Sequence, residues 1–254
     1  MHYVSSGTGP AVVLIHGLFG NLDNLKNLAN ALEANHQVIR VDLPNHGLSE
    51  HWQYLDYPLL AEACVELLYS LNLTEAHFVG HSMGGKVAMA LALLHPEKVT
   101  SLVVADIAPV AYEPRHQTVF AGLTSLTLDQ STNRKSALEH LISADIDLGT
   151  AQFLLKNLQR TDNGFEWKMN LDGLIENYPQ IIAWDITDKQ YDKACFFIRG
   201  GDSQYVLAEH TNAIMTQFPR VSAKTINGTG HWLHAQKPEI FNRLVAEFID
   251  SNSQ

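Results

Sequence analysis

Six short apolar segments recur along the chain, and most are separated from the next by a longer stretch with helical spacing. The segments are AVVLIHG (11–17), QVIRVDL (37–43), AHFVGHS (76–82), TSLVVADI (100–107), ACFFIRG (194–200) and VSAKTI (221–226). Apolar strands that alternate with helices are typical of a mostly parallel sheet covered by helices on both faces. The sequence therefore predicts an α/β fold, with a core made of residues 1–109 and 193–254.

The alternation stops after Pro109, and residues 110–192 contain no convincing strand pattern. Apolar residues instead recur at three- and four-residue spacing, which is typical of amphipathic helices. The segments with this spacing are HQTVFAGLTSL (116–126), RKSALEHLIS (134–143) and TAQFLLKNLQR (150–160). We therefore predict that residues 110–192 form a helical cap inserted into the core.

Charge and composition narrow the class of partner. The 254 residues carry a formal net charge of -10, whereas nucleic-acid binding needs clustered Lys and Arg. No signal peptide and no apolar run long enough to cross a membrane is present, which predicts a cytoplasmic protein with a small-molecule partner and no membrane partner. Cys64 and Cys195 are expected to be small buried side chains. Nothing in the sequence specifies an oligomeric state.

The string Val79-Gly80-His81-Ser82-Met83-Gly84-Gly85 has the pattern G-x-S-x-G between a predicted strand and a predicted helix. A sharp turn at this junction exposes the serine oxygen and holds it in a strained backbone conformation. Glycines flank the serine because side chains there would collide across the turn. The context predicts Ser82 as a nucleophile in an α/β-hydrolase fold, which the pattern alone would not establish.

A second loop, His16-Gly17-Leu18-Phe19-Gly20, follows the first predicted strand. The backbone N–H groups of Leu18 and Met83 can donate hydrogen bonds to an oxyanion, and Met83 also lies at a helix N-terminus. Phe19 is expected to line the substrate pocket together with Leu18. His16 is expected to shape the loop rather than to react.

His231 is the predicted base, because Asn227-Gly228-Thr229-Gly230-His231-Trp232 follows the last strand and precedes the C-terminal helix. His234 is expected to face elsewhere and make an ordinary polar contact, and His46 and His81 are expected to be turn or packing residues. No spacing of metal ligands such as HExxH occurs, so no catalytic metal is predicted.

Two aspartates compete for the role of orienting acid. Asp106 ends the strand TSLVVADI, and Asp202 lies in the loop after ACFFIRG, where many proteins of this fold hold their acid. The usual spacing from Gly200 places Ser203, not Asp202, at that position. We therefore favour Asp106 as the acid and Ser203 as an auxiliary hydrogen-bonding partner, with Asp202 as the alternative.

The chain resembles the YbfF-type esterases, bacterial relatives of the abhydrolase-domain-containing protein 11 family. The resemblance covers nearly the whole chain and is carried by GTGPAVVLIHGLFGNLDNLKNLANAL, VIRVDLPNHGLS, VGHSMGGKVAMALAL, VVADIAPVAY and IRGGDSQYV. It implies hydrolysis of carboxylic esters or thioesters without a cofactor. It also implies an acid on the strand before the cap and a serine in the usual acid position, matching Ser82, Asp106, Ser203 and His231.

The expected activity is hydrolysis of short- to medium-chain acyl esters, or of acyl-CoA thioesters, through an acyl-enzyme intermediate. Five cations of the cap would suit an anionic substrate or simply be solvated: Arg115, Arg134, Lys135, Arg160 and Lys168. Two alternatives stay open. The same residues can serve a C–C bond hydrolase, lyase or perhydrolase, and the scaffold can serve a non-catalytic binding protein.

Overall fold

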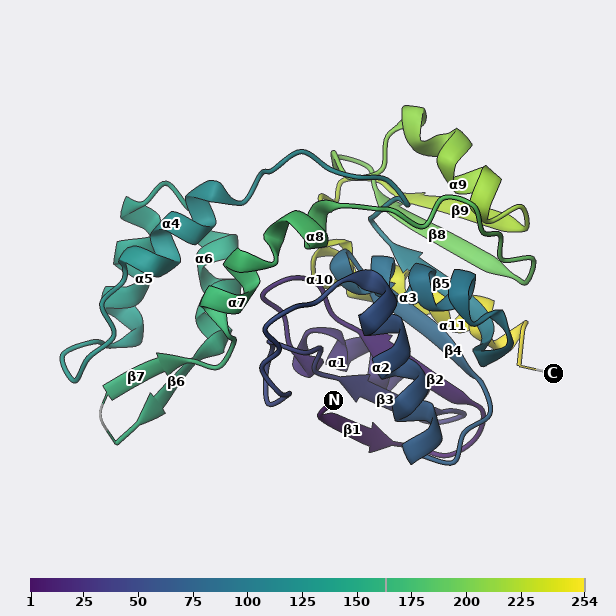
Figure 1. The fold of residues 1–254 in the computed structure, drawn as a ribbon, viewed down its shortest axis with the longest axis horizontal. Helices are drawn as coiled ribbons and strands as arrows, with labels where there is room; N and C mark the ends of the chain where they lie inside the picture. Colours follow the sequence, from purple (N-terminus) through teal and green to yellow (C-terminus); the bar gives the residue numbers. More distant parts are fainter. Residues whose placement is uncertain (163, 254) are drawn as a thin grey trace.

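A seven-stranded sheet forms the centre of the molecule (Figure 1). The computed structural model describes residues 1–162 and 164–253. The strands, in their spatial order, are β1 (Tyr3–Ser6), β3 (Gln37–Val41), β2 (Ala11–Ile15), β4 (Ala76–His81), β5 (Val99–Ala105), β8 (Cys195–Gly200) and β9 (Val221–Ile226). All six predicted segments contribute parallel strands. The predicted α/β fold with a mostly parallel sheet is therefore confirmed.

Strand β1 was not predicted. It runs antiparallel to β3, with Tyr3 opposite Val41 and Ser6 opposite Val38. Three of its four residues are exposed, because β1 lies at the edge of the sheet. A short edge strand needs no apolar run, so hydrophobic patterning does not reveal it.

Helices cover both faces of the sheet (Figure 1). The main core helices are α1 (Lys26–Leu32), α2 (Tyr57–Ser70), α3 (Met83–Leu94), α9 (Thr211–Gln217) and α11 (Pro238–Asp250). Side chains of β2 alternate between the faces: Val12 and Leu14 belong to the cluster with α1 and α11, and Val13 and Ile15 to the cluster with α2 and α3. Among the described residues, no helix is both long enough and apolar enough to cross a membrane.

The insertion leaves the sheet after β5 and returns before β8, and most of its elements lie to the left of the core in Figure 1. Its elements are α4 (Gln117–Ser125), α5 (Arg134–Ser143), α6 (Leu148–Leu154), β6 (Leu158–Thr161), β7 (Gly164–Trp167), α7 (Leu171–Glu176) and α8 (Tyr178–Ile182). The helices expected over 116–126 and 134–143 are present as α4 and α5. Gln254, the last residue of the predicted core segment, lies outside the described residues.

The insertion also contains a two-stranded hairpin, so the prediction that residues 110–192 lack a strand is wrong. Strand β6 pairs antiparallel with β7, with Leu158 opposite Trp167 and Arg160 opposite Phe165. The helix expected over 150–160 ends at Leu154 and gives way to a 3-10 turn and then to β6. Strands of four residues are too short for their alternation to stand out against a helical pattern.

Lys86 joins the core to the returning end of the cap. It lies in the first turn of α3, is only 1 % exposed, and donates from Nζ to the carbonyl oxygens of Ile182 (3.1 Å) and Ala183 (2.9 Å). The ring centroids of Tyr57 and Tyr112 lie 5.4 and 4.9 Å from Nζ. Burial lowers the pKa of Lys86 to about 7, because the ammonium form is poorly solvated there.

This burial predicts a pH-dependent contribution to stability. An unfolded lysine titrates near pH 10.4, so between about pH 7 and pH 10.4 the unfolded chain binds the extra proton and the folded chain does not. The contribution of Lys86 to the free energy of unfolding therefore rises with pH in this window, by at most about 1.4 kcal/mol per pH unit. Below about pH 7 both states bind the proton and the contribution is constant.

Urea unfolding of the parent and of Lys86→Met at pH 6.5 to 9.5 would measure this effect. We expect the difference in unfolding free energy, parent minus variant, to increase with pH. Lys26→Met is the control, because it removes the same charge from an exposed position on α1. The difference in unfolding free energy between the parent and Lys26→Met is expected not to change with pH. Parallel pH profiles for the parent and Lys86→Met would contradict the prediction.

Candidate active site

Ser82 lies at the sharp turn between β4 and α3. Its backbone adopts φ 55° and ψ -123°, in the left-handed half of φ space that non-glycine residues avoid. A Cβ at Gly80 would lie 2.1 Å from the carbonyl oxygen of Gly84, and one at Gly84 would lie 2.4 Å from that of Ile15. Both flanking glycines are therefore required by close backbone approach, as the sequence predicts.

His231 reaches Ser82 from the loop between β9 and the short helix α10 (Leu233–Gln236). Its Nε2 lies 2.8 Å from Ser82 Oγ. Its backbone carbonyl accepts a hydrogen bond from His81 Nε2 at 2.8 Å, which ties the loop to the end of β4. The structure thus brings the predicted nucleophile and the predicted base into direct contact.

Asp106, and not Asp202, lies beside this histidine. Asp106 Oδ2 is 2.7 Å from His231 Nδ1, and Oδ1 accepts from the backbone N–H of Gly200 at 2.9 Å. Ser203 donates its hydroxyl to Oδ2 of the same carboxylate, which is fully buried. Asp202 is exposed, and its backbone N–H donates to the carbonyl of Thr229.

These partners set the tautomer of His231. An ionised carboxylate only accepts hydrogen bonds, so Nδ1 of the imidazole carries a proton and donates it to Asp106. Nε2 is then an acceptor facing the hydroxyl of Ser82. Three donors around a buried carboxylate replace the water that it loses on burial.

Leu18 and Met83, the predicted oxyanion donors, both line a small cavity of about 40 Å³ that includes Ser82. A Cβ at Gly17 would lie 3.1 Å from the Cβ of Ser82, so the loop after β2 runs directly past the serine. The next N–H along this loop, of Phe19, is already committed to His46 Nε2 at 3.2 Å. Between Leu18 and Phe19, Leu18 is therefore the better candidate for the predicted oxyanion donor of this loop.

Two buried histidines hold this loop in place. His16 accepts from the backbone N–H of Leu43 at Nε2 (3.1 Å), and its Nδ1 donates to the carbonyl of Gly17 (2.8 Å). The ring of His46 lies 5.0 Å from that of His16. Burial lowers the pKa of His46 to about 3 and also lowers the pKa of His16, so both stay neutral. The sequence predicted a structural role for His16 but did not indicate that His46 supports the loop.

A larger cavity of about 250 Å³, also lined by Ser82, lies between the core and the cap. The core contributes Phe19, which is 4 % exposed and packs edge-to-face on Phe120 of α4. The lining residues from the cap and its approach are Arg115, His116, Val119, Thr150, Phe153 and Leu154. Of the five cap cations singled out in the sequence, only Arg115 lines either cavity at Ser82.

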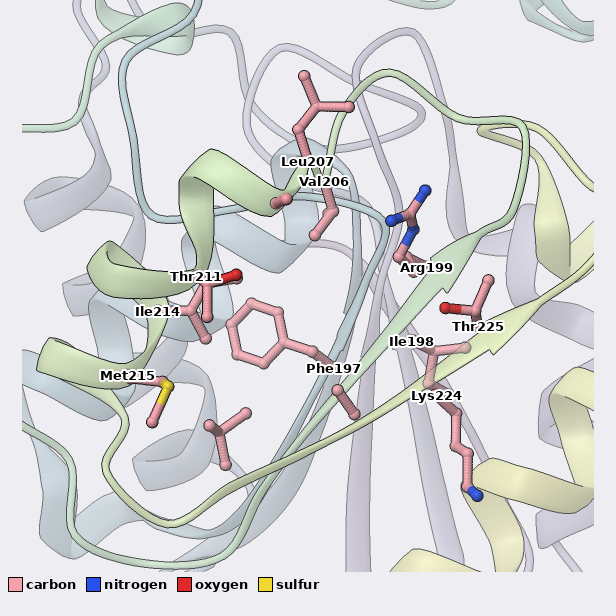
Figure 2. A pocket seen from close by; sticks show the side chains of 13 residues that line it. Phe197, Ile198, Arg199, Val206, Leu207, Thr211, Ile214, Met215, Lys224 and Thr225 are labelled. Carbon is pink, nitrogen blue, oxygen red and sulfur yellow. The ribbon is translucent and has the colours of Figure 1, made fainter.

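Another apolar hollow of about 310 Å³ lies between α9 and the strands β8 and β9, where Phe197 points toward Ile214 (Figure 2). None of Ser82, His231 and Asp106 lines it. The described part of the chain contains no group of three or more His, Cys, Asp or Glu side chains arranged to hold a metal ion.

The sequence did not indicate the contact of Tyr205 with His231 or the packing of His234 on His81, although His234 lines neither cavity at Ser82, as expected of a residue that faces elsewhere. The ring of Tyr205 stacks on that of His231, with centroids 3.8 Å apart and an interplanar angle of 21°. His234 does not make an ordinary polar contact: its ring lies 4.3 Å from His81, and its buried Nδ1 has no hydrogen-bond partner among the described residues. Burial lowers the pKa of His234 to about 3. An isolated aromatic residue carries no periodic signal, whether it lies in a loop, as Tyr205 does, or in the short helix α10, as His234 does, so only the tertiary structure reveals these contacts.

Comparison with known proteins agrees with this architecture. The family model described as the alpha/beta hydrolase fold matches residues 10–238. This chain belongs to the α/β-hydrolase family. Esterase YbfF of Escherichia coli is 38% identical over 94% of this chain and 92% of its own length. The mouse protein named sn-1-specific diacylglycerol lipase ABHD11 is 37% identical over 95% of this chain and 81% of its own length.

Among solved structures, one described as a marine microorganism esterase superposes with a TM-score of 0.94 at 35% identity. The match covers 97% of this chain and 98% of that one. This chain is thus a YbfF-type α/β-hydrolase related to ABHD11, and ester hydrolysis is the activity class that these relatives support.

Proposed function

We propose that this α/β-hydrolase cleaves carboxylic esters with Ser82 as nucleophile, His231 as base and Asp106 as orienting acid. The observation that carries the proposal is the hydrogen-bonded relay from Ser82 Oγ through both ring nitrogens of His231 to Asp106 Oδ2, at 2.8 and 2.7 Å. A nucleophile, a base and an orienting carboxylate in this order are the parts that acyl transfer requires.

In the first step, His231 Nε2 takes the hydroxyl proton of Ser82 as Oγ attacks the ester carbonyl carbon. The carbonyl oxygen becomes an oxyanion that accepts hydrogen bonds from the N–H groups of Leu18 and Met83. The imidazolium, stabilised by Asp106, then returns the proton to the leaving alcohol as the carbon–oxygen bond breaks. An acyl group stays on Ser82.

In the second step, water takes the place of the alcohol. His231 Nε2 accepts a proton from the water as its oxygen attacks the acyl carbon, and the second oxyanion forms in the same place. Collapse of this intermediate returns the proton to Ser82 Oγ and releases the carboxylic acid. Ser203 acts through Asp106, whose charge it stabilises by donating its hydroxyl hydrogen.

The dimensions of the site favour small substrates. The two cavities that meet at Ser82 measure about 250 and 40 Å³, whereas pockets for drug-sized ligands usually span about 300–1,000 Å³. Apolar side chains such as Phe19, Val119 and Phe153 line the larger one. We therefore propose that the substrates carry short- to medium-chain acyl groups, esterified to an alcohol or to a thiol such as that of coenzyme A. We also propose that the protein acts in the cytoplasm.

A phosphonate that reacts with serine hydrolases, followed by peptide mass spectrometry, tests the proposal. We expect one phosphonyl group per chain, on Ser82. A panel of p-nitrophenyl esters from C2 to C12 should show hydrolysis that declines beyond medium chain lengths. Turnover of a diketone or formation of a peracid, without ester hydrolysis, would instead favour the C–C bond hydrolase or perhydrolase alternatives. Absence of both labelling and turnover would support a binding protein.

A further inference from the structure

The loop that follows β8 contacts two members of the proposed triad at once. Ser203 donates its hydroxyl to Asp106, and the backbone N–H of Tyr205 donates to Ser203 Oγ at 3.2 Å. The ring of Tyr205 lies nearly parallel to the imidazole of His231, with the two centroids 3.8 Å apart. A single short segment therefore supports both the acid and the base.

The position of Tyr205 is itself fixed from the cap side. Tyr112, at the start of the insertion, donates its hydroxyl to the carbonyl oxygen of Tyr205 at 2.6 Å and accepts from the backbone N–H of Ala108 at 2.9 Å. The guanidinium carbon of Arg115 lies 4.8 Å from the ring centroid of Tyr205. These contacts tie the loop after β8 to the loop after β5, which carries Asp106.

Only one of the two hydrogen bonds of the His231 ring persists throughout the proposed reaction. The bond to Asp106 persists, whereas the bond to Ser82 disappears once Oγ is esterified and has no hydrogen to donate. In the acyl-enzyme, Nε2 has lost its protein partner and faces only the incoming water, so the Nδ1 hydrogen bond to Asp106 restrains rotation of the imidazole about the Cβ–Cγ bond less tightly than both bonds together. A flat aromatic surface against one face of the imidazole restricts this rotation.

We infer that Tyr205 is a positioning residue, whose ring holds the plane of the His231 imidazole while water attacks the acyl-enzyme. The inference deepens the proposed function and rests on it. Its physical basis is orientation, since displacement of a reacting group by about 1 Å can slow a reaction about 100-fold. The expected consequence is that loss of the ring slows deacylation more than acylation.

Tyr205→Leu removes the ring, and Tyr205→Met is a second such variant in case the first folds poorly. With p-nitrophenyl butyrate, each is expected to lower kcat about 10- to 100-fold with KM unchanged or lower, because deacylation becomes limiting. A burst of p-nitrophenol equal to the enzyme concentration should precede the slow steady state. Tyr205→Phe retains the ring and should stay within about threefold of the parent kcat.

Tyr69→Leu provides the matched control, because Tyr69 is 63% exposed at the end of α2 and its substitution should leave kcat unchanged. The inference is overturned if both ring-deleting variants keep the parent kcat and show no burst. It is also overturned if Tyr205→Phe is as slow as Tyr205→Leu. Failure of the proposed function looks different: the parent itself would then neither hydrolyse the ester nor react with the phosphonate.

Discussion

Ser82→Ala is expected to reduce kcat/KM for ester hydrolysis at least ~10⁴-fold, which is the largest effect we foresee for any single substitution. Without Oγ no acyl-enzyme forms, and water must attack the ester directly. The backbone N–H groups of Leu18 and Met83 remain, so a small residual rate above the uncatalysed reaction is expected. Initial rates with p-nitrophenyl butyrate provide the comparison. The parent and the variant are purified on separate columns, so that no parent enzyme contaminates the variant.

The matched control replaces another buried serine of the same site. Ser203 contacts Asp106 but not Ser82, so Ser203→Ala should reduce kcat/KM only about tenfold, the effect of losing one hydrogen bond to a charged group. Because the members of the proposed triad are expected to act as a unit, Ser82→Ala combined with His231→Ala should be no slower than Ser82→Ala alone. Turnover by Ser82→Ala at close to the parent rate would contradict the proposed mechanism.

Asp106→Asn is expected to lower kcat about 10⁴-fold while KM stays nearly constant. The amide of asparagine can present N–H groups to His231 Nδ1, which favours the tautomer with the proton on Nε2. That tautomer cannot accept the proton of Ser82. Steady-state kinetics at pH 7 to 8 measure the loss, and far-ultraviolet circular dichroism verifies that the variant is folded.

Asp202→Asn makes the same chemical change one residue before Ser203. Its side chain is exposed, and the carboxylate makes no contact with His231. We expect kcat within about twofold of the parent, as for a surface substitution away from the site. The opposite result, a severe loss for Asp202→Asn and a mild one for Asp106→Asn, would move the orienting acid to the loop after β8.

The sequence alone predicts the central strands of the sheet and the sharp turn at Ser82. The mostly apolar runs over 11–17, 76–82 and 100–107 became central parallel strands, since strands that are buried on both faces are apolar along most of their length. The turn at Ser82 was also predictable from the sequence. Glycine is needed at position 80, because the carbonyl oxygen of Gly84 approaches too closely to leave room for a Cβ. Local sequence specified these features because local backbone sterics and burial suffice to produce them.

Short elements and long-range contacts were not readable in this way. Strand β1 and the hairpin β6–β7 are too brief for a periodic signal, and each exists because a neighbouring strand pairs with it. The stacking of Tyr205 on His231 joins residues from two different loops. No pattern within either loop indicates that contact.

The sequence by itself determined the parallel sheet, the strained serine turn and the candidates for base and acid. Only the tertiary structure shows which of Asp106 and Asp202 lies beside His231, since the two are far apart in the chain but follow adjacent strands of the sheet. The deciding factor is burial: at Asp106 the fold excludes water and supplies donors from Gly200, Ser203 and His231, whereas the side chain at Asp202 remains in solvent. A carboxylate's surroundings are created by segments that meet only on folding.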